Sequence, residues 1–338
     1  MCRVSCVLQR LKVFMLKYIL KRLLIAFPML LVMALLTFVL MQKTAGNYYD
    51  LLKMDPRVSP ETVERYVRLY QLDRPVLVQF LSWAKNLFRL EFGYSFYYNI
   101  PVKNVIAGRL LNTFILSFAS ILVTWLIAIP LGTFAALNRN RFWDRFIQTS
   151  SYFALSTPSF FLAMLLLYLG SRSGWIPLGG MRSAHYAELS LVGKCFDLLG
   201  HLIIPVAALS VASIGALQRI MRGNMLEVLG QQYILTARAK GLPEHRVIFR
   251  HALRNALNPL VTLLGYEFSS LLSGAALIEI ICSWPGLGSL MLTAVRSKDV
   301  YLVMASFMMG GVLFLIGNLL ADILLARLDP RIRYERSS

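Results

Sequence analysis

Three carboxylates lie inside or beside long apolar stretches of this sequence: Glu267, Glu279 and Asp322. A charge at the middle of a bilayer costs about 2.5–3.5 kcal/mol on insertion scales, so each should face other helices or water. Glu267 has two interpretations. Either it lines a path and favours solutes with a cationic group, or it pairs with a neighbour or lies nearer the membrane surface. Asp322 is close to Arg327, where pairing or snorkelling is sufficient.

Motifs for nucleotide, metal or hydrolase chemistry are absent. The sequence holds no GxxxxGK[ST] phosphate loop and no GxGxxG, and the nearest string, PGLGSL at Pro285–Leu290, lacks the last glycine. HExxH and GxSxG are absent too. We therefore expect no catalytic, cofactor-binding or metal site on this chain.

The four cysteines form no CxxC pair and no zinc spacing with the histidines. We interpret Cys195 and Cys282 as unpaired thiols. A disulfide between them is the alternative, if both face an oxidising compartment.

Composition places the chain in a membrane. Of its 338 residues 57% are hydrophobic and 15% are charged, whereas soluble domains are roughly 45–50% apolar and about 25% charged. The net charge of +18 could indicate nucleic-acid binding, but no basic patch interleaved with aromatic residues occurs. Lys and Arg retained in cytoplasmic loops explain the charge better.

Six apolar stretches are candidates for transmembrane helices. They are 23–41, 110–137, about 150–169, 202–217, 260–282 and 300–325. Pro28, Pro130 and Pro158 interrupt or start helices, which membrane proteins tolerate. Met15 begins MLKYILKRLL, which is typical of a start, so residues 1–14 are either an added tail or the result of a start placed too early.

Six spans place both termini on one side, and the larger positive charge of the segments on that side makes it cytoplasmic. The predicted organisation is a tail (1–22), a first transmembrane helix (23–41), an outer loop module (42–109), a five-helix core (110–325) and a cytoplasmic tail (326–338). The core contains a cytoplasmic loop, 218–258. The fold class is all-α membrane protein.

The outer loop module contains its own helices. Ser59-Pro60-Glu61 is typical of a helix start with proline at the first position. Apolar residues at helical spacing after Val78 predict a second, amphipathic helix at the membrane surface. The module is either a cap and docking surface or a loop that only packs on the protein.

The cytoplasmic loop predicts a pair of short helices. Residues 232–240 form the first, Gly241 suits the left-handed C′ position, and Pro243 suits the first position of the second. Arg246, Arg250 and Arg254 then share one face of a regular helix, beside an apolar face that begins at Phe249 and packs on the bundle. Periodicity alone leaves two roles open, an anchor at the lipid surface or a docking element whose alanines allow close approach of another chain.

The string TARAKGL, from Thr236 to Leu242, resembles the cytoplasmic "EAA" loop of ABC importer permeases, in the version of the dipeptide and oligopeptide permeases. Further matching strings are LDRPVLVQFLSW, HLIIPVAALS, IEIICSWPGLGSLMLTAV and LADILLARLDPRIR. The resemblance covers about 15–333. It implies a type I ABC importer permease fold of six helices in a bacterial inner membrane.

The resemblance also implies partners. A homologous second permease would share the translocation path, two ATPase subunits would bind ATP and Mg, and a periplasmic solute-binding protein would deliver the solute. Residues carried over to the ATPase-coupling loop are Tyr233, Thr236, Ala237, Gly241, Leu242 and Pro243. Leu235 departs from the family's Glu. Glu279 matches a family position near the outer mouth, and Glu267 would favour a peptide amino terminus.

Three functions remain open from sequence. The first is import of di- and oligopeptides; the second keeps the architecture but carries nickel complexes, glutathione, oligosaccharides or another small solute. The third, an intramembrane enzyme, requires paired catalytic groups at matching depth, which the sequence lacks. A stand-alone channel or secondary carrier would need no ATPase.

Overall fold

The computed structural model describes the backbone of residues 2–43, 59–69, 74–174 and 176–328, and the side chains of most of them. Within these residues the regular secondary structure is helical apart from one short hairpin. It divides into two compact units, Met1–Leu110 with Leu290–Leu315 and Leu111–Ser289 with Ile316–Ser338. Three helices, α5, α13 and α14, contribute residues to both.

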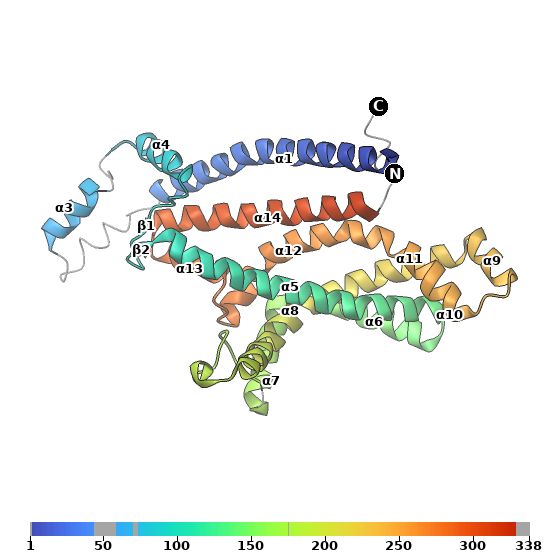
Figure 1. The fold of residues 1–338 in the computed structure, drawn as a ribbon. Coiled ribbons are helices and arrows are strands. Elements are labelled where there is room, and N and C mark those ends of the chain that lie inside the picture. The colour runs from blue at the N-terminus through green and yellow to red at the C-terminus, as the bar shows by residue number, and fades with distance from the viewer. Residues whose placement is uncertain (1, 44–58, 70–73, 175, 329–338) are drawn as a thin grey trace. The chain divides into compact units, whose positions relative to one another are not determined.

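The first unit is built around the first helix. Its elements are α1 (Cys2–Lys43), α3 (Pro60–Leu69), α4 (Val76–Leu87), β1 (Tyr94–Ser95), β2 (Ile100–Pro101) and the beginning of α5 (Val102–Leu137), followed by most of α13 (Leu287–Arg296) and the first half of α14 (Val300–Leu328) (Figure 1). The core of the unit joins α1, α4 and α14 through Ala34, Phe38, Phe80, Trp83, Met304 and Met308. The predicted outer-loop helices are α3 and α4.

The β1–β2 hairpin is fixed to the start of α14 by one buried carboxylate. Asp299 Oδ2 accepts hydrogen bonds from Ser95 Oγ at 2.7 Å and from the Tyr97 backbone at 3.2 Å. Its Oδ1 accepts from the Leu302 backbone at 3.2 Å, as an N-terminal cap does. One side chain therefore closes the hairpin and begins the helix.

The second unit contains the remaining helices. These are the rest of α5, then α6 (Phe142–Ser156), α7 (Ser159–Ser173), η1 (Tyr186–Glu188), α8 (Leu191–Leu229), α9 (Gln232–Ala239), α10 (Glu244–Arg246), the π-helix η2 (Val247–Ala252), α11 (Leu253–Ala256) and α12 (Asn258–Ile281) (Figure 1). Two apolar clusters form its core, one around Trp284 and one around Met221 and Met225.

Four helices among the described residues are long and apolar enough to cross a membrane: Leu24–Lys43 of α1, α5, α8, and Val300–Leu319 of α14. The pair α6 and α7 makes a fifth if it is one span. The bounds of α12 agree with the predicted stretch 260–282. Part of its side chains lies outside the described set, so the count of six spans stays a prediction.

The predicted stretch 150–169 is divided between two helices at Pro158, one of the prolines expected to interrupt or start a helix. The chain turns by 99° between α6 and α7, at Thr157 and Pro158. Proline disfavours the helical conformation of the residue before it, and Thr157 is extended, with φ −89° and ψ 117°. The segment is thus a broken span or a re-entrant pair of helices.

The predicted stretch 202–217 is much shorter than the helix that contains it. α8 has 39 residues, which at 1.5 Å per residue is roughly 58 Å, whereas the hydrocarbon layer is about 30 Å thick. The polar residues that ended the apolar stretch, such as Lys194 and Arg222, simply lie in the same helix beyond it.

Glycine lets α6 and α5 approach α8 closely. A β-carbon at Gly215 would lie 2.9 Å from the Ser151 carbonyl oxygen, and one at Gly132 would lie 2.7 Å from the Gln218 carbonyl oxygen. Ser151 Oγ also donates to Gln218 Oε1 at 2.8 Å. Small residues are the usual means of close helix packing in membranes.

Candidate functional site

The segment after α8 forms the predicted helix–turn–helix. α9 ends with C-cap Lys240, and Gly241 follows with φ +74°. The Gly241 N–H donates to the Arg238 carbonyl at 2.9 Å and the Leu242 N–H to the Ala237 carbonyl at 3.4 Å, which is the Schellman pattern of a helix end. The sequence prediction of Gly241 as C′ is confirmed. Pro243 is the N-cap of α10 rather than its first residue.

An ion pair closes the turn between α9 and α10. The Arg238 guanidinium donates to both Glu244 carboxylate oxygens, at 2.5 and 3.2 Å. This hydrogen bonding lowers the pKa of Glu244 and raises the pKa of Arg238. The pair weakens as the pH falls through the lowered pKa of Glu244. Because both side chains are partly exposed, the pair stabilises the turn only slightly.

The second helix is not regular, and this moves the beginning of the predicted apolar face, whereas Ala256 and Leu260 of that face are buried as expected. It contains a six-residue π-helix, Val247–Ala252, whose i→i+5 bonding differs from the i→i+4 bonding that the prediction assumed. The buried residues are Val247, Ala252, Ala256 and Leu260. The first two are five residues apart, which matches the wider turn of a π-helix. Phe249, expected to pack on the bundle, is 64% exposed.

α9 has one buried and one exposed side. Ile234 and Ala237 pack into the cluster with Met221 and Met225, and Ala237 is 8% exposed. Ala237 therefore packs against this chain's own core, and its assignment to the ATPase-coupling loop stays a prediction. Tyr233, Leu235 and Thr236 lie on the exposed side.

Polar contacts tie the exposed side to the rest of the unit. Asn255 Nδ2 donates to the Tyr233 hydroxyl at 2.9 Å, joining α9 to α11. Asn224 Nδ2 of α8 donates to the Ala256 carbonyl at 3.2 Å. The pair of helices is thus attached to α8 by side chains as well as by the chain itself.

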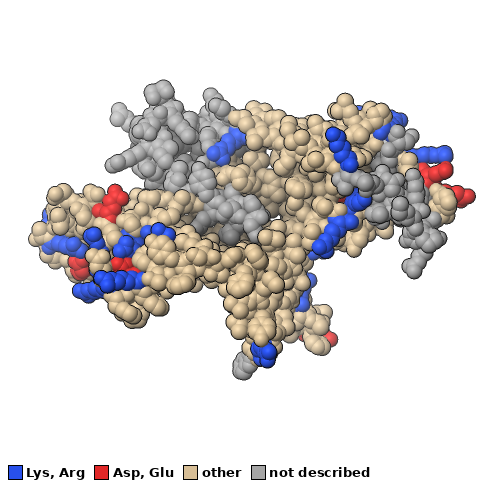
Figure 2. Space-filling model, turned by 180° about the vertical axis from the view of Figure 1, so that it is seen from behind, with Lys and Arg blue, Asp and Glu red and all other residues tan. Residues whose placement is uncertain are grey.

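This end of the second unit is basic. Figure 2 shows Lys and Arg gathered over the end that carries α9 to α11. The exposed basic residues there are Arg238, Lys240, Arg246, Arg250 and Arg254. Exposed Leu235, Tyr233 and Phe249 lie among them, so the surface combines positive charge with apolar contact area.

A partly buried ion pair joins α6 to α8. Arg222 donates to both oxygens of Asp144, from Nε at 2.6 Å and from the second guanidinium nitrogen at 2.7 Å. The Asn140 backbone N–H adds a bond of 2.9 Å. Asp144 is 2% exposed. Sequence reasoning missed this pair because its members are 78 residues apart.

Glu279 is buried in a polar network, with 0% of its surface exposed. Thr113 Oγ1 donates to Oε1 at 2.6 Å, and the backbone N–H groups of Gly288 and Ser289 donate to Oε2 at 2.7 and 3.2 Å. The Leu287 N–H donates to Thr113 Oγ1 at 2.7 Å. Glu279 thus caps the beginning of α13, where an anion is favourable. Its assignment to a translocation path stays a prediction.

The remaining predicted positions are the two other membrane carboxylates and the cysteines. The side chains of Glu267 and Asp322 lie outside the described residues. Cys195 and Cys282 are both free, one exposed and one buried, so the unpaired interpretation is confirmed. Among the described side chains no three His, Cys, Asp or Glu residues gather as metal ligands.

Two family profiles match the chain. One, described as binding-protein-dependent transport system inner membrane component, matches residues 128–334. The other describes the N-terminal part of such membrane components and matches residues 15–117. Together they match most of both units.

Curated relatives cover almost the whole chain. The oligopeptide transport system permease protein AppB of Bacillus subtilis is 39% identical over 94% of this chain and 99% of its own length. The oligopeptide transport system permease protein OppB of Haemophilus influenzae is 35% identical over 95% of this chain and 100% of its own length.

Proposed function

Because the chain belongs to the family of inner-membrane components of binding-protein-dependent transport systems, we propose that it is a permease subunit for short peptides, driven by separate ATPase subunits. The single observation that carries the coupling part is the two-sided α9, which is buried on its Ile234 and Ala237 side and exposed on its Leu235 side. A helix fixed on one side and open on the other suits a docking element.

The proposed coupling contact is the exposed side of α9 with the turn after it. Tyr233, Leu235 and Thr236 would contact an ATPase subunit, and Gly241, Leu242 and Pro243 would hold the turn in place. ATP and Mg would bind to the ATPase chains. Movement of α9 would reach the membrane through its buried side, because that side shares a core with α8.

The remaining architecture follows the family. A second, homologous permease would complete the path, two ATPase subunits would dock, and a periplasmic binding protein would deliver the solute. Six spans would leave both termini in the cytoplasm, with α3 and α4 outside it. Glu267 would lie along the path and favour the amino terminus of a peptide.

The substrate proposal is tested by uptake. Both relatives are named for oligopeptide transport, so we expect vesicles with the full importer to accumulate labelled di- to pentapeptides only when ATP and the binding protein are present. Excess unlabelled peptide should compete, whereas glutathione, an oligosaccharide and a nickel complex should not. Competition by one of these three alone would favour the alternative solute.

The coupling proposal predicts a strong effect of Leu235→Glu. Leu235 is 49% exposed, so the charge should not disturb the fold. Loss of an apolar anchor at an interface costs about 2 kcal/mol or more, roughly a thirtyfold loss of affinity. We expect copurification of the ATPase subunits and ATP-driven uptake to fall together while the variant stays in the membrane.

The matched control is Leu191→Glu, the same change at an exposed leucine that begins α8. It should keep normal ATPase association. Undiminished ATPase association and uptake in Leu235→Glu would show that α9 is not the contact.

A further inference from the structure

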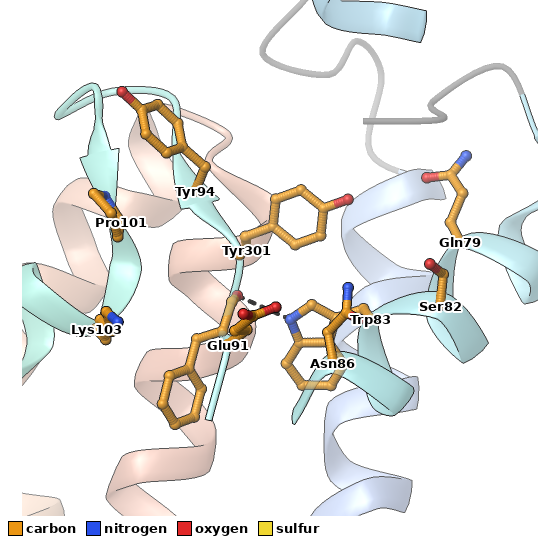
Figure 3. Close-up of a pocket in the computed structure, with 11 residues that line it drawn as sticks. Gln79, Ser82, Trp83, Asn86, Glu91, Tyr94, Pro101, Lys103 and Tyr301 are labelled. Atoms are coloured by element: carbon orange, nitrogen blue, oxygen red, sulfur yellow. Dashed lines mark hydrogen bonds between the residues drawn. The ribbon is translucent and has the colours of Figure 1, made fainter. Parts of the chain in front are cut away.

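The first unit contains an open cavity of about 470 Å³, which is within the usual size range of ligand pockets. α4 forms one wall, and the other is formed by the β1–β2 hairpin, the residues just before it and the start of α5, which carries Lys103. In Figure 3, Lys103 and Pro101 lie on the hairpin side, Gln79, Ser82 and Asn86 lie on the α4 side, and Glu91 and Tyr301 lie between them. Nothing in the proposed transport cycle uses this cavity.

The walls of the cavity are held by specific contacts. Trp83 Nε1 donates to the Phe92 carbonyl at 2.9 Å and fixes α4 to the segment before the hairpin. Gly93 has φ +96°, and a β-carbon there would lie 3.0 Å from the Tyr301 ring. The ring can reach the cavity only because this position is glycine. The cavity is therefore preorganised.

The cavity presents one negative and one positive side chain. Within the part of the chain that the structure describes, neither Glu91 nor Lys103 forms an ion pair or a side-chain hydrogen bond. Each is exposed and available to a ligand. The amides of Gln79 and Asn86 and the hydroxyl of Ser82 add neutral polar groups, and Tyr301 adds an aromatic face that can attract a cation.

The surroundings of the cavity indicate that the ligand comes from the membrane. α4 packs along α1: the rings of Phe38 and Phe80 are 6.0 Å apart, and those of Phe27 and Phe88 are 5.6 Å apart. Residues 27 and 38 are about 16 Å apart along a helix, and both lie in the apolar stretch of α1. α4 and the turn after it therefore follow the span rather than cover its end.

Exposed apolar side chains accompany α4 along this path. Leu77, Leu81, Phe88 and Leu90 are each more than half exposed, and such residues beside a polar cavity suit the boundary between headgroups and acyl chains. A water-soluble ligand would gain nothing from them. A ligand with a zwitterionic head and apolar tails fits both parts.

We propose that the cavity binds the headgroup of a phospholipid that carries a primary ammonium and a phosphate, such as phosphatidylethanolamine. Glu91 and the Tyr301 ring take the ammonium, Lys103 takes the phosphate, and the acyl chains lie against the exposed apolar residues of α4. The site would join α4, the hairpin and α14 through one lipid. It is independent of the solute that the permease carries.

Binding to the full-length chain, purified with the subunits that accompany it and stripped of lipid, tests this by native mass spectrometry. Phosphatidylethanolamine, phosphatidylglycerol and phosphatidylcholine with the same acyl chains are titrated separately. We expect one phosphatidylethanolamine to bind about tenfold more tightly than either of the others, because one charge-assisted hydrogen bond to Glu91 distinguishes it.

Variants identify the site. Glu91→Gln should weaken phosphatidylethanolamine about tenfold and leave phosphatidylglycerol unchanged, and Lys103→Met should weaken both. Glu188→Gln, at an exposed residue of the other unit, and Lys85→Met, on α4 but outside the cavity, are controls that should change neither.

Unchanged lipid affinity in Glu91→Gln and Lys103→Met would overturn the proposal. A titration with the zwitterionic dipeptide Ala-Ala, which has no acyl chains, distinguishes a lipid headgroup from a free solute that carries the same charged groups. If Ala-Ala binds with the same dependence on Glu91 and phosphatidylethanolamine gains nothing from its tails, the ligand is a free solute and the lipid assignment is wrong.

Discussion

Replacing Arg222 with methionine is expected to destabilise the protein by about 1–3 kcal/mol, the usual cost of leaving a buried hydrogen-bond acceptor without its donor. Asp144, which is 2% exposed in the wild type, would lose both guanidinium hydrogen bonds and keep the hydrogen bond of the Asn140 N–H and the interaction with the Gln148 side chain. The carboxylate then has no positive charge beside it in a largely buried position. The contact between α6 and α8 should loosen first, because the pair joins these two helices.

Thermal unfolding in detergent, followed by size-exclusion fluorescence, measures this effect. The double variant Arg222→Met with Asp144→Leu should regain most of the lost stability, because an apolar pair of similar size often equals a buried ion pair. A single variant as stable as the wild type would mean that the ion pair contributes little. Failure of the double variant to recover would mean that the arginine stabilises the fold through other contacts.

The second large effect is expected for Gly288→Ala. A β-carbon at this position would overlap the backbone of Ala276 and lie 3.0 Å from Glu279 Oε2. Because the backbone of α12 cannot move aside at low cost, the beginning of α13 must shift away from it. The hydrogen bonds from the Gly288 and Ser289 N–H groups to Glu279 then weaken. Overpacking costs about 1–3 kcal/mol, and each unsatisfied buried donor adds about 1–3 kcal/mol.

The control for this variant is Gly223→Ala, because a β-carbon at Gly223 meets nothing within 4 Å. Alanine within a helix usually stabilises it relative to glycine. The same unfolding assay should therefore rank Gly223→Ala at or above the wild type and Gly288→Ala well below it. Equal stability of both variants would show that α12 and α13 tolerate a wider separation than the contact implies.

Features set by neighbouring residues were predictable. Gly241 follows a short helix and precedes a proline, and such local turn chemistry determines the left-handed position and the helix break whatever the rest of the chain does. Pro60 at the beginning of α3 follows from the same kind of local rule. The apolar stretches of α1, α5 and α14 were found because membrane-spanning helices need long apolar runs.

Features set by distant residues were not predictable. Glu279 attracted notice as a charge in an apolar region, but its partner Thr113 is 166 residues away. Ala237 was interpreted as a contact site because small residues allow close approach, and only the fold shows which surface approaches it. The π-helix Val247–Ala252 could not be found from a regular wheel, since the wheel presumes the geometry that the segment lacks.

The length of α8 has a mechanical consequence. Beyond Pro205 no proline interrupts it as far as Leu229, a rod of roughly 36 Å. Its far end holds Arg222 and Met225, beside the segment proposed to dock an ATPase. A tilt of about 10° around Val206 would carry the Leu229 end through about 6 Å, by the length of the rod alone. A small tilt of α8 inside the bilayer therefore moves its Leu229 end by more than the rise of one helical turn.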